Sequence, residues 1–323
     1  MKGGPNVPLY AVNGQWINYE DTGGDHEAVV LAHGFLMDRE MFAPQIAAAK
    51  AGSRFITWDA RCHGDTENTA DAFSYWDLAD DLKGLLDHLG IERAVIGGMS
   101  QGGFVALRFA LKYPERVSAL VLIGTQAGLE DPEKVATYQV MLDVWEAEGL
   151  NDQLARTIAA IILGNEWRGS DQWIAKWRQK PGSLLRQAFQ TLVSRDDIHN
   201  RLGEIKVPNL VIHGTADAAI DIEKAQRMCS DLADCEQFVA IEDAGHACNL
   251  THPKLVNLAI QQFLSGLKLT APQRAEQRAN TIRADVERRS GERRDQSGPR
   301  RQTFAPEDRR LAERRALAER RAR

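Results

Sequence analysis

A single serine lies between two pairs of glycines in the stretch AVIGGMSQGG, residues 94–103. An apolar, β-branched run precedes the glycines, and the stretch FVALRFALKY, which has the spacing of a helix, follows them. Gly98-Met99-Ser100-Gln101-Gly102 therefore fits the pattern G-x-S-x-G at a junction of strand and helix. In that setting a sharp turn exposes the serine oxygen, and the flanking positions must lack bulk. The pattern predicts that Ser100 is a nucleophile.

Two phosphate-binding motifs and a flexible linker are alternative interpretations of the same stretch. A dinucleotide-binding G-x-G-x-x-G is excluded because, counting from Gly98, Ser100 occupies the position of the second glycine. A P-loop would end in Gly-Lys-Ser/Thr, and no lysine is near. The strand and helix patterns on both sides exclude a linker. Catalysis is the interpretation that fits.

A serine hydroxyl becomes reactive when a base takes its proton and an acid orients that base. Two later segments, VIHGTADAAI and EDAGHACNLTHP, each end a predicted strand with a loop. Both loops fall at the carboxyl ends of strands, where open α/β sheets bind ligands. We predict Asp217 as the acid and His246 as the base. Asp221 is the nearest rival for the acid, and His213 and His252 are weaker rivals for the base.

Hydrolysis also needs hydrogen-bond donors for the negative charge that develops on the attacked oxygen. His33-Gly34-Phe35 directly follows the apolar run AVVLA, so we expect the backbone N–H of Phe35 to be one donor. The N–H of Gln101, next to the serine, is the other predicted donor.

Methionines near the proposed nucleophile and tryptophans in a later helical region are candidates for an apolar substrate pocket. Trp173 and Trp177 are four residues apart and share one face of a helix. Packing of these tryptophans onto the protein body is an equal alternative. Arg39 and Arg61 are interpreted as solvated or structural, rather than as a clamp for a substrate carboxylate. The predicted pocket residues are Met37, Met99, Trp145, Trp173 and Trp177.

Strands alternate with helices along most of the chain, and the strands are nearly continuous apolar runs. This order predicts an α/β fold with a parallel sheet covered by helices on both faces. A hairpin is expected around Asn13-Gly14. We predict an α/β core over 1–127 and 202–269, with a helical lid at 128–201. Residues 271–323, rich in arginine and glutamate, are predicted to be a largely disordered tail.

The chain resembles the α/β-hydrolase superfamily, and within it the 3-oxoadipate enol-lactonase-like and non-haem haloperoxidase-like members. The similar pieces are HGF, WDARCHG, LGIERAVIGGMSQGG, YPERVSALVLIGT, HGTAD and AGHACNLTHP, in the order of the family. The resemblance implies the α/β-hydrolase fold with a mostly parallel eight-stranded sheet, and it implies Ser100, Asp217 and His246 as the triad. Cys62 and Gln101 depart from the residues usual at their positions, and the tail beyond Leu269 has no counterpart.

Charge is distributed unevenly along the 323 residues, whose net charge is −5. Residues 271–323 hold sixteen arginines and nine acidic residues, which leaves 24 basic and 36 acidic residues in the body. An acidic body excludes nucleic acid as a ligand of the core, whereas the basic tail is suited to an acidic partner. Glutamate is interspersed throughout the tail, so that an inert, solvated extension is the favoured interpretation.

Location and cofactors follow from what the sequence lacks. The four cysteines have no CxxC spacing, and the N-terminus has no apolar core of signal-peptide length. We therefore expect reduced thiols, no membrane span and a cytoplasmic location. Neither HExxH nor grouped histidines occur, so no metal is expected, and the mechanism requires no cofactor.

The sequence leads to two functional hypotheses. The first is a serine hydrolase of small ester or lactone substrates that works through an acyl-enzyme, with C–C bond hydrolysis and perhydrolysis as variants of the same triad. The second is a ligand-sensing or partner-binding protein on a hydrolase fold, with its partner held by the lid or the tail.

Overall fold

The computed structural model describes residues 9–50, 53–66, 71–165 and 167–267. Within them the strands form one eight-stranded sheet in the order β1-β2-β4-β3-β5-β6-β7-β8. β1 and β2 are antiparallel to their neighbours, and all strands from β4 onward across the sheet are parallel. The strands are β1 (Leu9–Val12), β2 (Gln15–Asp21), β3 (Ala28–Ala32), β4 (Arg54–Trp58), β5 (Ala94–Met99), β6 (Val117–Ile123), β7 (Asn209–Gly214) and β8 (Cys235–Ile241). The predicted mostly parallel sheet is confirmed.

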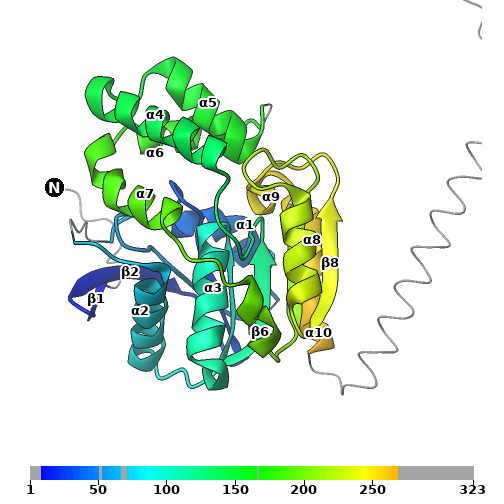
Figure 1. Cartoon of the computed structure of the whole chain (residues 1–323). Helices are drawn as coiled ribbons and strands as arrows, with labels where there is room; N and C mark the ends of the chain where they lie inside the picture. Colours follow the sequence, from blue (N-terminus) through cyan, green and yellow to red (C-terminus); the bar gives the residue numbers. More distant parts are fainter. Residues whose placement is uncertain (1–8, 51–52, 67–70, 166, 268–323) are drawn as a thin grey trace, which may run out of the picture. The chain divides into compact units, whose positions relative to one another are not determined.

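Helices cover both faces of the sheet. Helices α2, α3 and α8 lie in front of it in Figure 1, and α1 and α10 pack against the other face. The α-helices are α1 (Ala43–Ala47), α2 (Tyr75–His88), α3 (Gln101–Lys112), α4 (Pro132–Glu148), α5 (Asp152–Leu163), α6 (Ser170–Trp177), α7 (Arg186–Val193), α8 (Ile222–Asp231), α9 (Cys248–Thr251) and α10 (Pro253–Gly266). Short 3-10 helices span Arg39–Phe42, Pro114–Arg116, Gly182–Leu185 and His199–Glu204.

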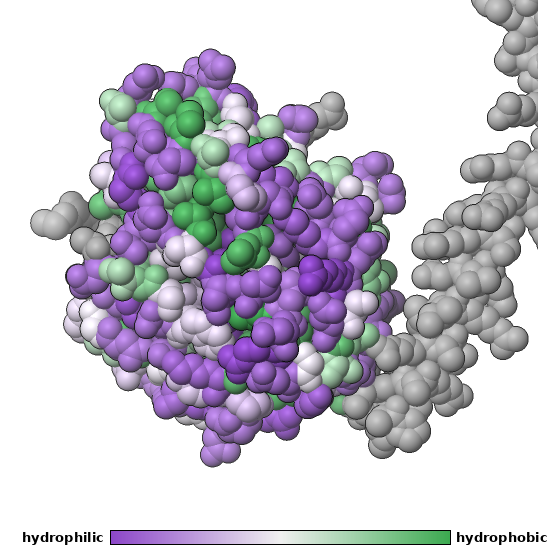
Figure 2. Space-filling view, in the orientation of Figure 1, coloured by the Kyte–Doolittle hydropathy of each residue, from purple (hydrophilic) through white to green (hydrophobic). Residues whose placement is uncertain are grey.

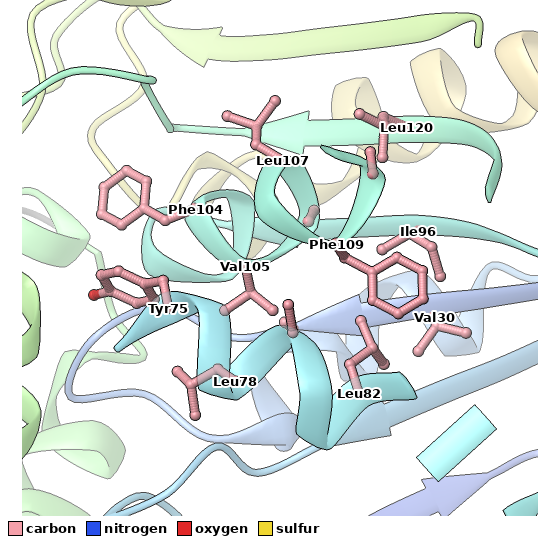
Figure 3. Close-up of a cluster of buried hydrophobic side chains, with 14 of the residues drawn as sticks. Val30, Tyr75, Leu78, Leu82, Ile96, Phe104, Val105, Leu107, Phe109 and Leu120 are labelled. Carbon is pink, nitrogen blue, oxygen red and sulfur yellow. The ribbon is translucent and has the colours of Figure 1, made fainter. Parts of the chain in front are cut away.

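Alternation along the buried strands divides the core into two layers. In β3, Val30 belongs to the apolar cluster on the α2 and α3 side, whereas Val29 and Leu31 belong to the cluster on the α1 and α10 side. Successive side chains of a strand point to opposite faces, so a strand covered on both faces must be apolar throughout. Figure 3 shows the first layer, with Phe109 of α3 beside Val30.

The N-terminal hairpin forms as the turn chemistry predicts. Asn13 and Gly14 both have positive φ, 49° and 76°, as a tight two-residue turn between twisted strands requires. The turn places β1 against β2, with Val12 opposite Gln15. Asn13 also donates a 3.0 Å side-chain hydrogen bond to Asp81 of α2, which ties the turn to the core.

Four α-helices, α4 to α7, occupy the chain between β6 and β7. We call residues 128–201 the helical insert. Figure 1 shows these helices gathered above the edge of the sheet where the parallel strands end. Figure 2 shows hydrophobic residues on the same part of the surface, while hydrophilic residues cover most of the core below. The boundaries of a lid at 128–201 remain a prediction, and the predicted tail at 271–323 lies outside the described residues.

A disulfide joins two of the four cysteines. Cys229 near the end of α8 is bonded to Cys235, the first residue of β8, with 5.4 Å between their Cα atoms. The turn that leads from this helix into the strand brings the two residues together, although their spacing matches no common motif. The expectation of reduced thiols is therefore wrong for this pair. Cys62 and Cys248 are buried.

No helix in the part of the chain that the structure describes is long and apolar enough to cross a membrane.

The glycines of the serine turn allow backbones to meet at close range. A Cβ atom at Gly102 would lie 1.9 Å from the carbonyl oxygen of Ala32, and one at Gly98 would lie 2.3 Å from the carbonyl carbon of Gly102. Contacts this short cannot be relieved by side-chain rotation, because both neighbours are backbone. The first turn of α3 therefore fits against the ends of β3 and β5 only with glycine at these positions.

We expect Gly102→Ala to lower the free energy of unfolding by about 3 kcal/mol, because the helix must move away from β3. Gly203→Ala is the matched control, since a Cβ atom there would meet nothing within 4 Å, and it should change stability by less than about 0.5 kcal/mol. Urea unfolding monitored by tryptophan fluorescence measures both changes. Equal stability of the two variants would contradict the close-contact argument.

Candidate active site

Ser100 stands at the sharp turn between β5 and α3 in a strained backbone conformation. Its φ is 52° and its ψ is −116°, a combination that non-glycine residues rarely adopt and that costs about 1–3 kcal/mol. Neighbouring strand ends hold the turn, because the Ser100 N–H donates to the Ile123 carbonyl at 2.9 Å. The Thr125 hydroxyl donates to the Ser100 carbonyl at 2.8 Å. The turn aims the side chain at a cavity.

The cavity beside Ser100 has a volume of about 110 Å³. A cavity holds one water in roughly 10–15 Å³ by the same measure, so there is room for a small organic molecule. Ser100 and His246 both line the cavity, and most of the other walls are apolar side chains of the helical insert. They include Tyr138, Met141, Trp145, Ile162, Leu185 and Phe189.

His246 is oriented by a short hydrogen bond to a buried carboxylate. Its Nδ1 lies 2.7 Å from Oδ2 of Asp217. The same Oδ2 lies 3.1 Å from Nε2 of His213. The other oxygen of Asp217 accepts from the backbone N–H groups of Ala219 at 2.8 Å and Ile220 at 3.0 Å. Three hydrogen-bond donors thus fix the carboxylate, while His213 Nε2 donates to the Ile220 carbonyl at 2.8 Å. With Nδ1 occupied, the Nε2 of His246 is left as its proton-accepting atom.

The partners of Asp217 keep it ionised. Burial alone would raise the pKa of this fully buried carboxyl, but the charge of His246, its hydrogen bond to the carboxylate and the nearby His213 outweigh that effect. They hold the pKa of Asp217 well below its usual range. A buried carboxylate that stays negative stabilises positive charge on the imidazole beside it, as a base needs while it carries a proton.

The loop that carries Phe35 is held by two buried histidines. His33 donates from Nδ1 to the Gly34 carbonyl at 2.8 Å, and its Nε2 accepts from the Ala60 N–H at 2.9 Å. His63 accepts from the Leu36 N–H at 3.3 Å. Burial lowers the pKa of both imidazoles, which keeps them neutral in these bonds. Phe35 lines the cavity.

Gln101 is the first residue of α3, where a helix N–H has no carbonyl within its own helix to bond. Its backbone position next to Ser100 is the one that the sequence predicts for a second oxyanion donor. The Gln101 side chain is buried.

Among the predicted pocket residues, Trp145 lines the cavity that contains Ser100, and the other four do not. Met37, Trp173 and Trp177 line a smaller neighbouring cavity, and Met99 is buried in the core. Trp177 donates from Nε1 to the Leu36 carbonyl at 2.7 Å, so it braces the Phe35 loop. The helical spacing of the two tryptophans correctly placed them on one buried face, but that face packs onto the protein body.

The rival residues occupy other positions. Asp221 has an exposed side chain paired with Lys134, and His252 is bonded to the adjacent Thr251. Arg39 and Arg61 form buried ion pairs with Asp59 and Asp81, which agrees with the structural role predicted for them. Within the described residues, no three His, Cys, Asp or Glu side chains gather as metal ligands would.

Sequence reasoning missed two groups. His213 lies 3.1 Å from the Asp217 carboxylate, a relation that its position at a strand end did not indicate. Glu130 and Tyr138 line the cavity among apolar neighbours, and no motif surrounds either of them.

Comparison with known proteins identifies the family. Residues 27–253 match the family model described as the alpha/beta hydrolase fold, and the chain belongs to that family. The 3-oxoadipate enol-lactonase 1 of Acinetobacter baylyi is 28% identical over 233 residues, which cover 70% of this chain and 84% of that protein. The 2-hydroxy-6-oxononadienedioate/2-hydroxy-6-oxononatrienedioate hydrolase of Paraburkholderia phymatum is 31% identical over 274 residues, covering 77% of this chain and 90% of that protein.

A solved structure shares both fold and sequence features. A thermophilic esterase from Thermogutta terrifontis superposes with a TM-score of 0.71 at 30% identity, covering 81% of this chain and 98% of that one. The predicted α/β-hydrolase fold and the predicted kinship with enol-lactonases and other hydrolases are confirmed.

We expect the stability supplied by the Asp217 carboxylate to depend on pH. Because its pKa is lower in the folded chain than the value of about 3.9 in an unfolded chain, its contribution is complete at neutral pH and falls with the pH below about 5. The stability difference between the wild type and Asp217→Asn should shrink by about 1 kcal/mol between pH 7 and pH 3.

Urea unfolding at both pH values measures this difference. Asp221→Asn is the matched control, since it removes an exposed carboxylate four residues away. A constant difference for Asp217→Asn would show that its folded pKa is not depressed.

Proposed function

We propose that the protein is a serine hydrolase of small carboxylic esters or lactones. The observation that carries the proposal is one arrangement: Ser100, in its strained turn, shares a cavity with His246, whose Nδ1 is bonded to the buried Asp217. Each of these residues comes from a loop at the carboxyl ends of the parallel strands. Family membership supports the same class of chemistry.

In the proposed reaction, Ser100 Oγ attacks the carbonyl carbon while His246 Nε2 takes its proton. The resulting tetrahedral oxyanion accepts hydrogen bonds from the backbone N–H groups of Phe35 and Gln101. His246 then returns the proton to the leaving oxygen, and an acyl-enzyme on Ser100 remains. Water activated by His246 hydrolyses the acyl-enzyme and frees the serine. Asp217 fixes the tautomer and orientation of the imidazole throughout.

The walls of the cavity support a small, mainly apolar substrate. Side chains such as Met141, Trp145 and Phe189 surround the serine, and burying an alkyl chain against them is favourable by roughly 0.8 kcal/mol per methylene group. The A. baylyi relative is named for lactone hydrolysis and the T. terrifontis neighbour for esterase activity, and both reactions attack a carboxylic ester carbonyl.

A second activity on the same triad is hydrolysis of a C–C bond in an oxo acid. It is supported by the P. phymatum relative, which is 31% identical and named for hydrolysis of an unsaturated hydroxy-oxo dioate. The apolar cavity favours the ester reaction for this chain.

We expect Ser100→Ala to abolish hydrolysis of p-nitrophenyl esters, because removal of the nucleophile lowers kcat by about 10⁶. Rates on acetate through octanoate are compared for the wild type and the variant, with circular dichroism as the check on folding. A fluorophosphonate probe should label the wild type alone. Absence of both turnover and labelling in the folded wild type would refute the proposal and favour a ligand-sensing role.

We expect Asp217→Asn to lower kcat by about 10⁴, because an amide cannot hold the imidazole in the required tautomer. Asp221→Asn, four residues away, should retain at least half of the activity, since its carboxylate pairs with Lys134 at the surface. Steady-state kinetics on p-nitrophenyl butyrate measure both. A severe loss in Asp221→Asn with little loss in Asp217→Asn would reassign the acid.

A further inference from the structure

One wall of the mainly apolar cavity carries a carboxylate. Glu130 lies in the segment that leads from β6 into α4 and lines the same cavity as Ser100 and His246. Its side chain is only 5% exposed. Burying a charge among apolar groups is costly unless the charge is paired, so the partners of this carboxylate decide what it can do.

Glu130 has one paired oxygen and one unpaired oxygen. Oε2 accepts from the guanidinium of Arg195 at 3.2 Å, whereas Oε1 is buried without a hydrogen-bond partner among the residues that the structure describes. Arg195 is itself held by donating to the carbonyls of Gly128 at 3.0 Å and Leu192 at 2.8 Å, and its guanidinium stacks at 4.3 Å over the ring of Phe104. The cation is thus fixed, and Oε1 keeps its acceptor capacity.

Tyr138, which lines the same cavity, has a pKa that nearby carboxylates affect. Burial raises the pKa of Tyr138, and the carboxylates of Glu130 and Asp217 raise it further. The phenol therefore stays protonated, and the charges that act on it are those of carboxylates. A second anion brought into this region would be repelled, whereas a hydrogen-bond donor would be attracted.

We infer that Glu130 is a specificity-determining residue. Its Oε1 accepts a hydrogen bond from a donor on the substrate chain, in the simplest case a hydroxyl group, and its charge disfavours chains that carry a carboxylate. The inference rests on the proposed ester hydrolysis, because it concerns which substrates reach Ser100. A buried acceptor that only the right substrate satisfies is a strong source of discrimination.

The test uses three series of p-nitrophenyl esters with chains of five to eight carbons, ending in a methyl, a hydroxyl or a carboxylate group. For Glu130→Gln we expect the hydroxyl-to-methyl ratio of kcat/KM to fall about fivefold relative to wild type, because a neutral acceptor binds a hydroxyl more weakly than a charged one. The carboxylate-to-methyl ratio should rise about tenfold, because the like charge is gone.

Glu133→Gln is the matched control, since Glu133 is an exposed glutamate in the first turn of α4, and both ratios should stay within twofold of wild type. Ratios in Glu130→Gln equal to those of the control would overturn the inference. Should Glu130→Gln fail to fold, the rates of the wild type on the carboxylate and methyl esters test the inference. Carboxylate esters hydrolysed as fast as methyl esters at every chain length would also overturn it.

The same measurements separate this inference from the proposed function. Ser100-dependent turnover without discrimination by Glu130 leaves the hydrolase standing and removes the specificity role. Absence of Ser100-dependent turnover on all three series overturns both.

Discussion

The contact between the first turn of α3 and the ends of β3 and β5 fixes the backbone turn that carries Ser100. Helix and strand backbones approach so closely there that no Cβ atom fits at Gly98 or Gly102. The approach forces the chain to reverse direction within one residue, and Ser100 takes the strained conformation that results. The strain persists because hydrogen bonds from both sides and a fully buried core hold the turn. The reactive side chain is therefore placed by the packing of backbone, before any catalytic partner is considered.

The other members of the site are held by a different principle. Asp217 and His246 lie on loops, which are usually more mobile than strands, yet the Asp217 carboxylate accepts three hydrogen bonds and has His213 beside it. Saturating a buried charge in this way removes the cost of burying it and leaves one arrangement available. His33 and His63 serve the Phe35 loop similarly, through bonds to backbone groups.

Much of this could be predicted from the sequence. The alternation of strands and helices along the chain, the hairpin at Asn13-Gly14 and the setting of Ser100 follow from local patterns, because apolar continuity, turn chemistry and small residues act over a few positions. The bond between Asp217 and His246 joins two loops whose relation the fold decides, and only the order of the two residues indicated it. Trp173 shares a buried face with Trp177 but lines no wall beside the serine. Helical periodicity predicts which residues share a buried face. It does not predict which part of the protein that face packs against.

Two side-chain pairings also escaped prediction, one of them between residues only six positions apart. The disulfide between Cys229 and Cys235 depends on the angle at which α8 turns into β8. Glu130 and Arg195 are 65 residues apart, and nothing near either one indicates its partner.

The ion pair between Glu130 and Arg195 joins the two ends of the helical insert. Glu130 stands where the chain leaves the core for α4, and Arg195 stands just after α7, where the chain returns. The pair thus clasps the two ends of the insert against Phe104 of α3. The two ends of the insert are therefore held at one point beside the serine turn, and the residue that holds the first end is also part of the cavity wall.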